Sequence, residues 1–239
     1  MNLKKQIKEI YEDEAKTYDK TREIFEKGRF ANRERKLLSE FLKRKSLVLN
    51  LACGTGRHLE FFVNRLENEV VGIDISVNML KIGKTKLLNT VKKNKNVHLI
   101  VADAENLPFR ENIFDAVVCS RAFYLFDNKF RILQEAHRVL KKRGNLAISS
   151  IFMDLLLTRI GIKMGLLGAD PKQYPYTSKQ LVDMFRKAEF ENIYRKCIVL
   201  FTGELTFLPK PFLHIINVIE DKLQGGRWVM VLGKKKQRI

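Results

Sequence analysis

The stretch that decides the fold runs Val48-Leu49-Asn50-Leu51-Ala52-Cys53-Gly54-Thr55-Gly56. Its apolar first half has the length and composition of a buried β-strand, which we expect over residues 46–51. Glycines follow the strand at once, and a backbone without side chains lets a ligand approach closely. Open α/β sheets bind their ligands at such strand ends. The stretch therefore predicts a strand, a ligand-binding turn and a following helix.

Further apolar runs recur along the chain at intervals typical of strand–helix–strand units. The expected strands cover residues 46–51, 70–75, 97–101, 114–119 and 145–150. The expected helices cover residues 58–66 and 128–140, and a third helix begins after Ser76, which is a good N-cap residue. This alternation predicts a doubly wound α/β fold with a mainly parallel sheet and helices on both faces.

The end of the chain has a different pattern. Thr177-Ser178 should cap a helix that continues through Ala188, and strands are expected over residues 193–201 and 228–232. A helical stretch over residues 211–223 separates these two strands. Strands connected in this way predict an antiparallel C-terminal edge pair on the parallel sheet.

Asp74 falls at the tip of the second expected strand, twenty positions after Gly54 (74 − 54). An acidic side chain there can accept hydrogen bonds from both hydroxyls of a ribose. Dinucleotide-binding proteins use the same pair of features, but their fingerprint needs a third glycine three positions after the second. Leu59 stands at that position. A dinucleotide-dependent oxidoreductase is therefore disfavoured.

The ordered motifs resemble those of class I S-adenosylmethionine-dependent methyltransferases, in particular the ubiquinone/menaquinone-biosynthesis type that acts on small molecules. Residues 48–56 resemble the family's first motif. The similarity continues in order through residues 71–76 with Met79-Leu80, 102–109, 112–115, and 138–141 with Gly144. About 100 residues are covered. The resemblance implies a Rossmann-like fold, S-adenosylmethionine as the methyl donor, S-adenosylhomocysteine as its product, and no metal.

The resemblance also implies a role for individual residues. Gly54 and Gly56, with Ala52 beside them, would face the methionine part of S-adenosylmethionine, and Asp74 would hold its ribose. The residues implied around the remaining parts of the molecule are Ile75 and Met79 on either side of the adenine, Asp103 and Ala104 at the adenine amino group, Ser120 and Arg121 at the border with the reaction pocket, and Tyr18 near the methionine end.

One departure bears on activity. Asn50 replaces the acidic residue that usually organises the glycine loop and helps hold the ammonium group of S-adenosylmethionine. An amide oxygen still accepts a hydrogen bond, although without charge assistance. A non-catalytic subunit that binds S-adenosylmethionine therefore remains an alternative.

The acceptor side gives weaker signals. A sulfonium methyl group is already electrophilic, so a general base is needed only for some acceptors. Tyr124, just after the fourth strand, is the candidate; His58 and His214 are weaker ones, each with an ordinary packing or surface alternative. Residues 151–168 are strongly apolar, which predicts either a packed helix or a lid over an apolar acceptor.

These features predict a single methyltransferase domain over residues 1–239. Residues 1–30 would form an N-terminal helical element, and residues 151–176 and 203–226 would be substrate-side additions. No secretory signal is evident at the start, so a cytoplasmic location is expected. Three scattered cysteines form neither a metal-binding pattern nor a disulfide framework.

The chain carries 45 Lys and Arg against 27 Asp and Glu, a formal charge of +18. A lysine-rich solvated surface is one explanation, and attraction to an anionic partner is the other. The favoured acceptor is a small, apolar or amphipathic, lipid-like molecule, with peripheral contact with an anionic membrane. An RNA methyltransferase is the runner-up, but the lysines are spread along the chain and no added RNA-binding domain is evident. The sequence predicts no oligomeric state.

Overall fold

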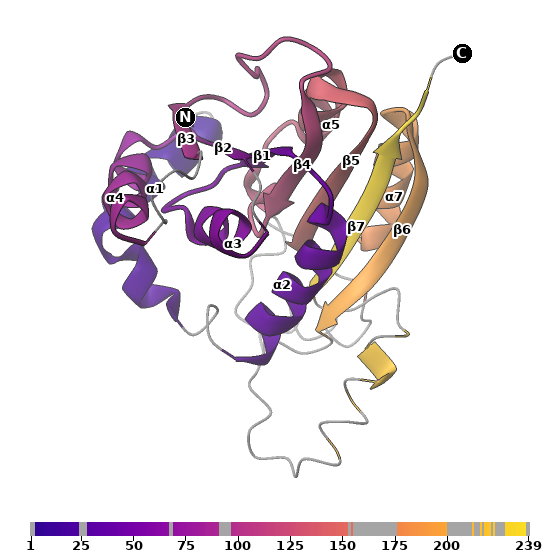
Figure 1. Cartoon of the computed structure of the whole chain (residues 1–239), viewed down its shortest axis with the longest axis horizontal. Helices are drawn as coiled ribbons and strands as arrows, with labels where there is room; N and C mark the ends of the chain where they lie inside the picture. The colour runs from indigo at the N-terminus through magenta and orange to yellow at the C-terminus, as the bar shows by residue number, and fades with distance from the viewer. Residues whose placement is uncertain are drawn as a thin grey trace.

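The computed structural model describes residues 3–23, 28–66, 69–90, 97–152, 154, 176–199, 212, 216, 218–220, 222 and 228–237. Within these residues, seven strands form one sheet in the order β3-β2-β1-β4-β5-β7-β6 (Figure 1). The strands are β1 (Leu47–Leu51), β2 (Glu69–Asp74), β3 (Val97–Val101), β4 (Phe114–Ser120), β5 (Leu140–Ile151), β6 (Phe190–Val199) and β7 (Trp228–Lys235).

The strand directions confirm the predicted fold class. β3, β2, β1, β4 and β5 pair in parallel, whereas β7 pairs antiparallel with both β5 and β6. From β1 the chain first proceeds to β2 and β3 on one side, and it then crosses to β4 and β5 on the other. The strand order therefore reverses between β1 and β4, which is where doubly wound sheets bind ligands.

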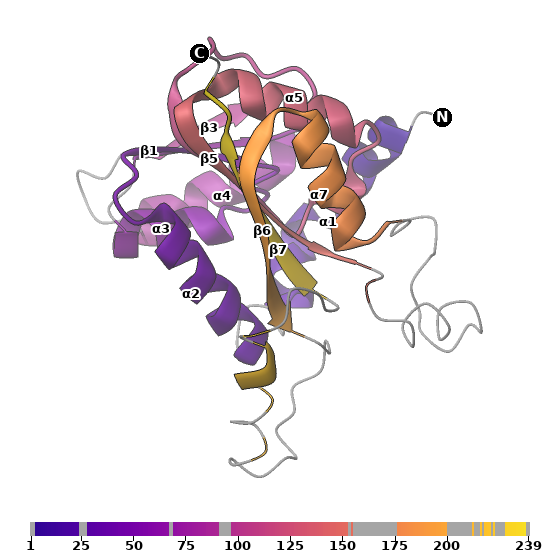
Figure 2. The ribbon, with the colours of Figure 1, turned by 90° about the vertical axis from the view of Figure 1, so that its right-hand side faces the viewer.

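Helices cover both faces of this sheet. The helices are α1 (Leu3–Thr21), α2 (Arg29–Leu42), α3 (Arg57–Leu66), α4 (Val77–Thr90), α5 (Lys129–Val139) and α7 (Ser178–Lys187), with a short 3-10 helix, η2, over Phe123–Leu125. The apolar sides of α5 and α7 pack in one hydrophobic core. Those of α2, α3 and α4 pack in a second core on the opposite face. Figure 2 shows α5 and α7 on one side of the sheet and α2 and α3 on the other.

Local signals fix the ends of several helices. The Thr177 hydroxyl accepts from the backbone of Gln180 while the Gln180 side chain accepts from the backbone of Thr177, so the predicted cap of α7 is a full capping box. Ser76 accepts from the backbone of Met79 at 3.1 Å and caps α4 as expected. Asn128 caps α5 in the same way, accepting from Arg131 at 3.0 Å.

Two predicted boundaries are wrong. The helix expected over residues 128–140 ends at Val139, and β5 begins at Leu140 rather than at Asn145. Arg143 takes a left-handed backbone conformation (φ 60°), and the pairing of β4 with β5 shifts register between Phe114 and Ala116. The first part of β5 is therefore irregular around Arg143. Its residues there are charged and not apolar, so the sequence pattern does not indicate a strand. β6 also begins earlier than predicted, at Phe190.

The C-terminal strands form the predicted antiparallel edge pair. β7 inserts between β5 and β6, so β6 alone occupies the sheet edge. The inserted strand is almost wholly buried: all positions from Trp228 to Gly233 are buried, and so is Lys235. Its near-continuous apolar sequence fits a strand with neighbours on both edges.

Several predictions fall wholly or partly outside the described residues: the apolar stretch 151–168, the substrate-side additions 151–176 and 203–226, and His214. Of the helical stretch expected over 211–223, residues 212, 216, 218–220 and 222 are helical. No helix within the described ranges is both long and apolar enough to cross a membrane.

Candidate active site

A cavity of about 400 Å³ opens at the carboxyl ends of the central parallel strands, where the strand order reverses. This volume lies within the range of small-molecule sites. The turn after β1 supplies its floor, the ends of β2 and β4 its sides, and α1 part of its cover. Sequence positions from Lys4 to Trp228 therefore meet in one site.

Asp74 joins two of the predicted motifs directly. It stands at the end of β2 and is 9 % exposed, and its Oδ2 accepts a hydrogen bond from the Gly54 backbone at 2.8 Å. Its Oδ1 accepts from the Ser76 backbone at 2.9 Å. Burial raises the pKa of Asp74, and the backbone hydrogen bonds from Ser76 and Gly54 offset only part of that effect. The backbone of Ile75 also contributes a hydrogen bond, so three of the carboxylate's four lone pairs have donors and capacity remains for a ligand hydroxyl.

The two glycines of the turn face different surroundings. Both have positive φ, 54° for Gly54 and 75° for Gly56. A Cβ added at Gly54 would meet nothing within 4 Å, because this glycine faces the cavity. A Cβ at Gly56 would lie 3.2 Å from Leu87 and 3.5 Å from Leu59, so Gly56 allows α3 and α4 to pack closely behind the turn. Gly56 does not line the cavity.

The structure brings the other predicted residues together. Besides Gly54 and Asp74, the cavity lining includes Tyr18, Asn50, Ala52, Ile75, Met79, Asp103, Ala104, Ser120, Arg121 and the proposed base Tyr124. Asn50 is 2 % exposed and Met79 is 1 % exposed, so both are enclosed by the protein. The Ser120 hydroxyl is buried and has no hydrogen-bond partner among the described residues.

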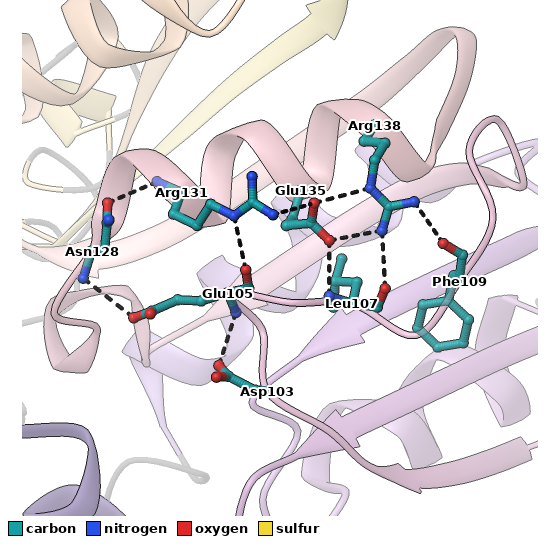
Figure 3. A network of polar contacts seen from close by, with 8 residues as sticks. All are labelled: Asp103, Glu105, Leu107, Phe109, Asn128, Arg131, Glu135 and Arg138. Atoms are coloured by element: carbon teal, nitrogen blue, oxygen red, sulfur yellow. Dashed lines mark hydrogen bonds and ion pairs between the residues drawn. The ribbon is translucent and has the colours of Figure 1, made fainter.

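The loop after β3 carries Asp103 and Ala104. Two residues of α5, Glu135 and Arg138, hold this loop by hydrogen bonds to its backbone. Glu135 accepts from the Leu107 backbone at 2.8 Å, and Arg138 donates to the carbonyls of Leu107 and Phe109 at 2.9 and 2.6 Å (Figure 3). Arg138 also pairs with Glu135 at 2.7 Å. Hydrogen bonds from Arg138 and Leu107 outweigh partial burial and lower the pKa of Glu135. Arg138, near the C-terminal end of α5, thus helps to hold the loop whose residues Asp103 and Ala104 line the cavity.

Comparisons with known proteins agree with this geometry. Residues 49–148 match the methyltransferase domain family. A demethylmenaquinone methyltransferase of Thermotoga maritima is 28 % identical over 229 residues, which are 84 % of this chain and 97 % of that protein. A ubiquinone/menaquinone biosynthesis C-methyltransferase of Blochmanniella pennsylvanica is 48 % identical over 105 residues, which are 43 % of this chain but only 41 % of that protein.

Solved structures share the fold. An S-adenosylmethionine-dependent methyltransferase of Thermotoga maritima, described as a possible histamine N-methyltransferase, superposes with a TM-score of 0.70 at 24 % identity and covers 95 % of this chain and 99 % of that one. A Haemonchus contortus phosphoethanolamine N-methyltransferase bound to S-adenosyl-L-methionine gives 0.63 at 19 % identity, with 86 % and 53 % covered. The chain is therefore similar to the class I S-adenosylmethionine-dependent methyltransferases, over residues 49–148 in sequence and over most of its length in fold.

The N-terminal helix α1 is fastened across the cavity at three points. Lys4 pairs with Asp103 at 2.8 Å and with Glu105 at 2.6 Å. Glu12 accepts from the backbones of Val77 and Asn78, at 2.8 and 2.9 Å, at the start of α4.

The third point is Asp19 near the end of α1, which accepts from Thr55 Oγ1 at 2.6 Å and from Arg57 Nε at 2.7 Å. Burial would raise the pKa of Asp19, but the hydrogen bonds from Thr55 and Arg57 and the charge of Lys86 outweigh it and lower the pKa. Between these points, Ile7, Tyr11 and Tyr18 face the cavity. Tyr18 and its neighbour Asp19 therefore connect α1 to the glycine turn and to the start of α3.

A buried charged cluster lies on the other side of the cavity. Glu34, on α2, is fully buried, and its Oε2 accepts from Arg121 Nε at 2.7 Å and lies 3.2 Å from His58 Nε2. Ser149 donates its hydroxyl to Oε1. Burial would raise the pKa of Glu34, but the charge of Arg121 and the contacts with His58 outweigh it, so the pKa lies well below its ordinary value. Glu34 therefore stays ionised at neutral pH.

Sequence reasoning named Arg121 and His58 but missed Glu34, which joins them, and the wall beside them. Glu34 and Phe30 lie on α2, ahead of every motif, and Trp228 begins the last strand. Phe30 and Trp228 both line the cavity with ring centroids 5.1 Å apart, and the Arg121 guanidinium lies 4.5 Å from the Phe30 ring centre. The only available signal was the amphipathic pattern of residues 29–42, which predicts a packed helix but not its position.

The described residues include three cysteines and no cluster of metal ligands. No group of three or more His, Cys, Asp or Glu side chains that could hold a metal occurs there. The three cysteines are free thiols. Burial raises the pKa of Cys119 and of Cys197 to about 12, so these two thiols keep their protons at neutral pH.

Proposed function

We propose that this protein transfers a methyl group from S-adenosylmethionine to a small, apolar or amphipathic acceptor. The observation that carries this proposal is the hydrogen bond between the Gly54 backbone and the Asp74 carboxylate, at the place where the strand order reverses. Gly54 has φ 54° and open space beside it, and the carboxylate next to it is buried. A ligand with a ribose and a bulky charged tail fits such a place because a ribose hydroxyl can donate to Asp74 while the tail passes Gly54.

The residues around this joint match the rest of the methyl donor. Ile75 and Met79 offer apolar surfaces for the adenine, and Asp103 with the Ala104 backbone lies at the edge where its amino group would donate. Asn50 and Tyr18 lie on the side of the amino-acid tail. When bound, S-adenosylmethionine supplies a sulfonium methyl group that is already electrophilic. The protein then has to align the acceptor with it and exclude water.

The same region disfavours a nicotinamide dinucleotide. Leu59 is fully buried, and its Cδ1 occupies the space beside Gly56 and Gly72. A dinucleotide fingerprint needs a glycine at this place so that the helix can approach the strand closely.

The acceptor side of the cavity combines rings with a few polar atoms. Phe30, Tyr124 and Trp228 supply the rings, and Arg121 and His58 supply the polar edge. The indole nitrogen of Trp228 is buried without a partner among the described residues, as is the Ser120 hydroxyl. A planar, mostly apolar acceptor with one or two polar groups suits this wall. The demethylmenaquinone methyltransferase of Thermotoga maritima supports the same class of acceptor.

Two measurements test the proposal. Titration calorimetry should detect binding of S-adenosylmethionine and S-adenosylhomocysteine and no binding of nicotinamide dinucleotides. Mass spectrometry should then detect methylation of a short-chain demethylmenaquinone analogue, kept reduced as its quinol, in preference to histamine or phosphoethanolamine. Binding of a dinucleotide without binding of S-adenosylmethionine would contradict the proposal. Cofactor binding with methylation of an amine alone would keep the methyltransferase and replace its acceptor.

A lipid-like acceptor also gives the basic surface a role. A net charge of +18 attracts the protein to anionic membranes, in which such acceptors dissolve. We therefore extend the proposal to a peripheral, salt-sensitive contact with anionic lipid. If RNA is the anionic partner instead, the same preparation should bind RNA in a salt-sensitive way and should not bind lipid vesicles.

A further inference from the structure

The buried cluster of Glu34, His58 and Arg121 has the composition of a proton-transfer site. Glu34 is fully buried and does not line the cavity, whereas His58 and Arg121 both do. A fully buried carboxylate is costly unless its partners compensate it. Here one carboxylate orients two side chains that face the acceptor from α3 and from the end of β4.

The contact with Glu34 determines which nitrogen of His58 can act. Nε2 lies 3.2 Å from an ionised carboxylate oxygen, so in the neutral ring Nε2 carries the proton and donates it. Nδ1 then holds the free lone pair. His58 makes no other hydrogen bond within the described residues, and its side chain is 12 % exposed. A ring nitrogen with a lone pair, on a side chain that lines the cavity, meets one requirement of a general base; the other is an acceptor within hydrogen-bond reach of that nitrogen.

The charges around His58 come from each element packed against it. α2 contributes Glu34, the turn after β4 contributes Arg121, and β5 contributes only the neutral Ser149. The neighbouring Arg57 is turned to Asp19 and to the Tyr18 carbonyl. Glu34 and Arg121 compensate each other's charge, and the Arg121 guanidinium also lines the cavity beside Phe30. A fixed cation there stabilises an oxyanion that forms on the acceptor.

We propose that His58 is the general base of the methyl transfer, that Arg121 stabilises the resulting anion, and that Glu34 is the positioning residue for both. This inference rests on the proposed function and adds the path of the proton. The acceptor's O–H bond breaks, its proton passes to Nδ1 of His58, and the electron pair stays on the acceptor. That pair makes the neighbouring ring carbon nucleophilic; this carbon bonds to the methyl carbon as the sulfur–carbon bond breaks, and the electron pair of the broken bond remains on sulfur. The ring carbon then loses its hydrogen as a proton to water and the ring oxygen takes a proton back from His58, which restores the aromatic ring and the neutral base.

The first test compares His58→Asn with Tyr124→Phe and His98→Asn, using the reduced demethylmenaquinone analogue as acceptor. His98 lies on β3 with its side chain 56 % exposed and serves as the matched control. General-base removal should lower kcat about 10²- to 10⁴-fold in His58→Asn with little change in KM. The dependence of kcat on pH should differ between wild type and His58→Asn, because the variant lacks the ring that accepts the proton.

Two readouts separate base catalysis from packing. Added imidazole should restore part of the rate of His58→Ala, because a small base can diffuse into the vacated space. Calorimetric affinity for S-adenosylhomocysteine should stay within about twofold of wild type in each His58 variant, since His58 touches the acceptor side. Rescue by imidazole is not expected if His58 only fills space, and unchanged affinity shows that the loss of rate does not come from weaker binding of the methyl donor.

Glu34 is tested through the tautomer of His58. In Glu34→Gln the ¹⁵N chemical shifts of the His58 ring should lose the signature of a single protonated Nε2, and kcat should fall with KM nearly unchanged. Glu34→Asp, which keeps the charge, should restore part of both. If Glu34→Gln does not bind S-adenosylhomocysteine, the Glu34→Asp variant and the wild-type ¹⁵N spectrum carry this test.

The outcomes also separate this inference from the proposed function. Failure of the wild-type protein to bind S-adenosylmethionine would contradict the proposed function. Normal binding and turnover with an unchanged rate and pH profile in His58→Asn would overturn this inference alone. A kcat loss in Tyr124→Phe without one in His58→Asn would transfer the role of base to Tyr124.

Discussion

Asp74 Oδ2 accepts the backbone N–H of Gly54 at 2.8 Å, so the carboxylate at the end of β2 fixes the glycine turn after β1. The two residues belong to different motifs, and parallel pairing of β1 with β2 brings them together. A single side chain thus has two roles: it holds the turn open and it offers its remaining lone pair to a ligand.

Replacing Asp74 by Ala should weaken binding of S-adenosylmethionine by about 1.5–3 kcal/mol, the usual scale for hydrogen bonds to a charged group. Asp115→Ala is the matched control: Asp115 also accepts two backbone amides, from Leu47 at 2.9 Å and Ser46 at 3.2 Å, but at the other end of β1. That variant should lose stability and keep its affinity. Calorimetry measures both, and equal affinity in the two variants would place the donor elsewhere.

The two glycines of the turn should respond differently to the same substitution. Gly54→Ala and Gly56→Ala carry similar backbone strain because both glycines have positive φ. Only the methyl group at residue 54 projects into the cavity, whereas that at residue 56 presses on Leu87 and Leu59. Gly54→Ala should therefore reduce affinity for S-adenosylhomocysteine more than Gly56→Ala, and Gly56→Ala should lower Tm more. The reverse order would contradict the orientation of the turn.

The cover formed by α1 should control how fast the product leaves. Glu12 accepts two backbone amides at the start of α4, where a carboxylate cap contributes about 1 kcal/mol. Its loss in Glu12→Ala should speed dissociation of S-adenosylhomocysteine severalfold, measured by stopped-flow fluorescence. Glu9→Ala is the control, because Glu9 on the same helix only faces the exposed Lys5 at 3.9 Å. Equal rates in both variants would show that α1 does not need to move.

Much of the fold could be predicted because it depends on local patterns. The strand ends that carry Gly54 and Asp74 follow from apolar runs and glycines, and the caps at Ser76 and Thr177 follow from short hydrogen-bonding motifs. The Glu34 cluster depends on contacts between residues 87 and 115 positions apart. No local pattern distinguishes Glu34 from the other charged residues of its helix, so only the packing of α2 against the sheet reveals it.

Glu34 should also make stability depend on pH. Its pKa lies well below the ordinary value of 4.5 in the folded protein, so the folded state binds fewer protons than the unfolded state as the pH falls. The stabilisation is therefore complete above about pH 4.5 and is lost at lower pH. In Glu34→Gln the free energy of unfolding should be lower than in wild type near neutral pH. The difference between the two proteins should shrink as the pH falls below about 4.5. Urea unfolding across the acid range measures it, and a constant difference would contradict the role of the charge.

The basic surface should bind anionic but not neutral lipid vesicles. With a net charge of +18, the attraction should weaken as added salt shortens the screening length to about 10 Å at 0.1 M and less above that. Co-sedimentation with vesicles and with RNA, on one preparation, decides between the two anionic partners. RNA binding would instead fall with salt according to the number of phosphates contacted.

The apolar stretch 151–168 supplies the second half of this test. Leu156→Asp together with Ile160→Asp changes residues outside the described part of the chain, which one of the two interpretations of the sequence assigns to a lid over an apolar acceptor. The pair should reduce turnover of a lipid-like acceptor and leave the affinity for S-adenosylhomocysteine unchanged, because burial of apolar surface contributes about 25 cal/mol per Å² to acceptor binding only. Tight RNA binding without any lipid association, and normal turnover in the double variant, would contradict the membrane-side acceptor.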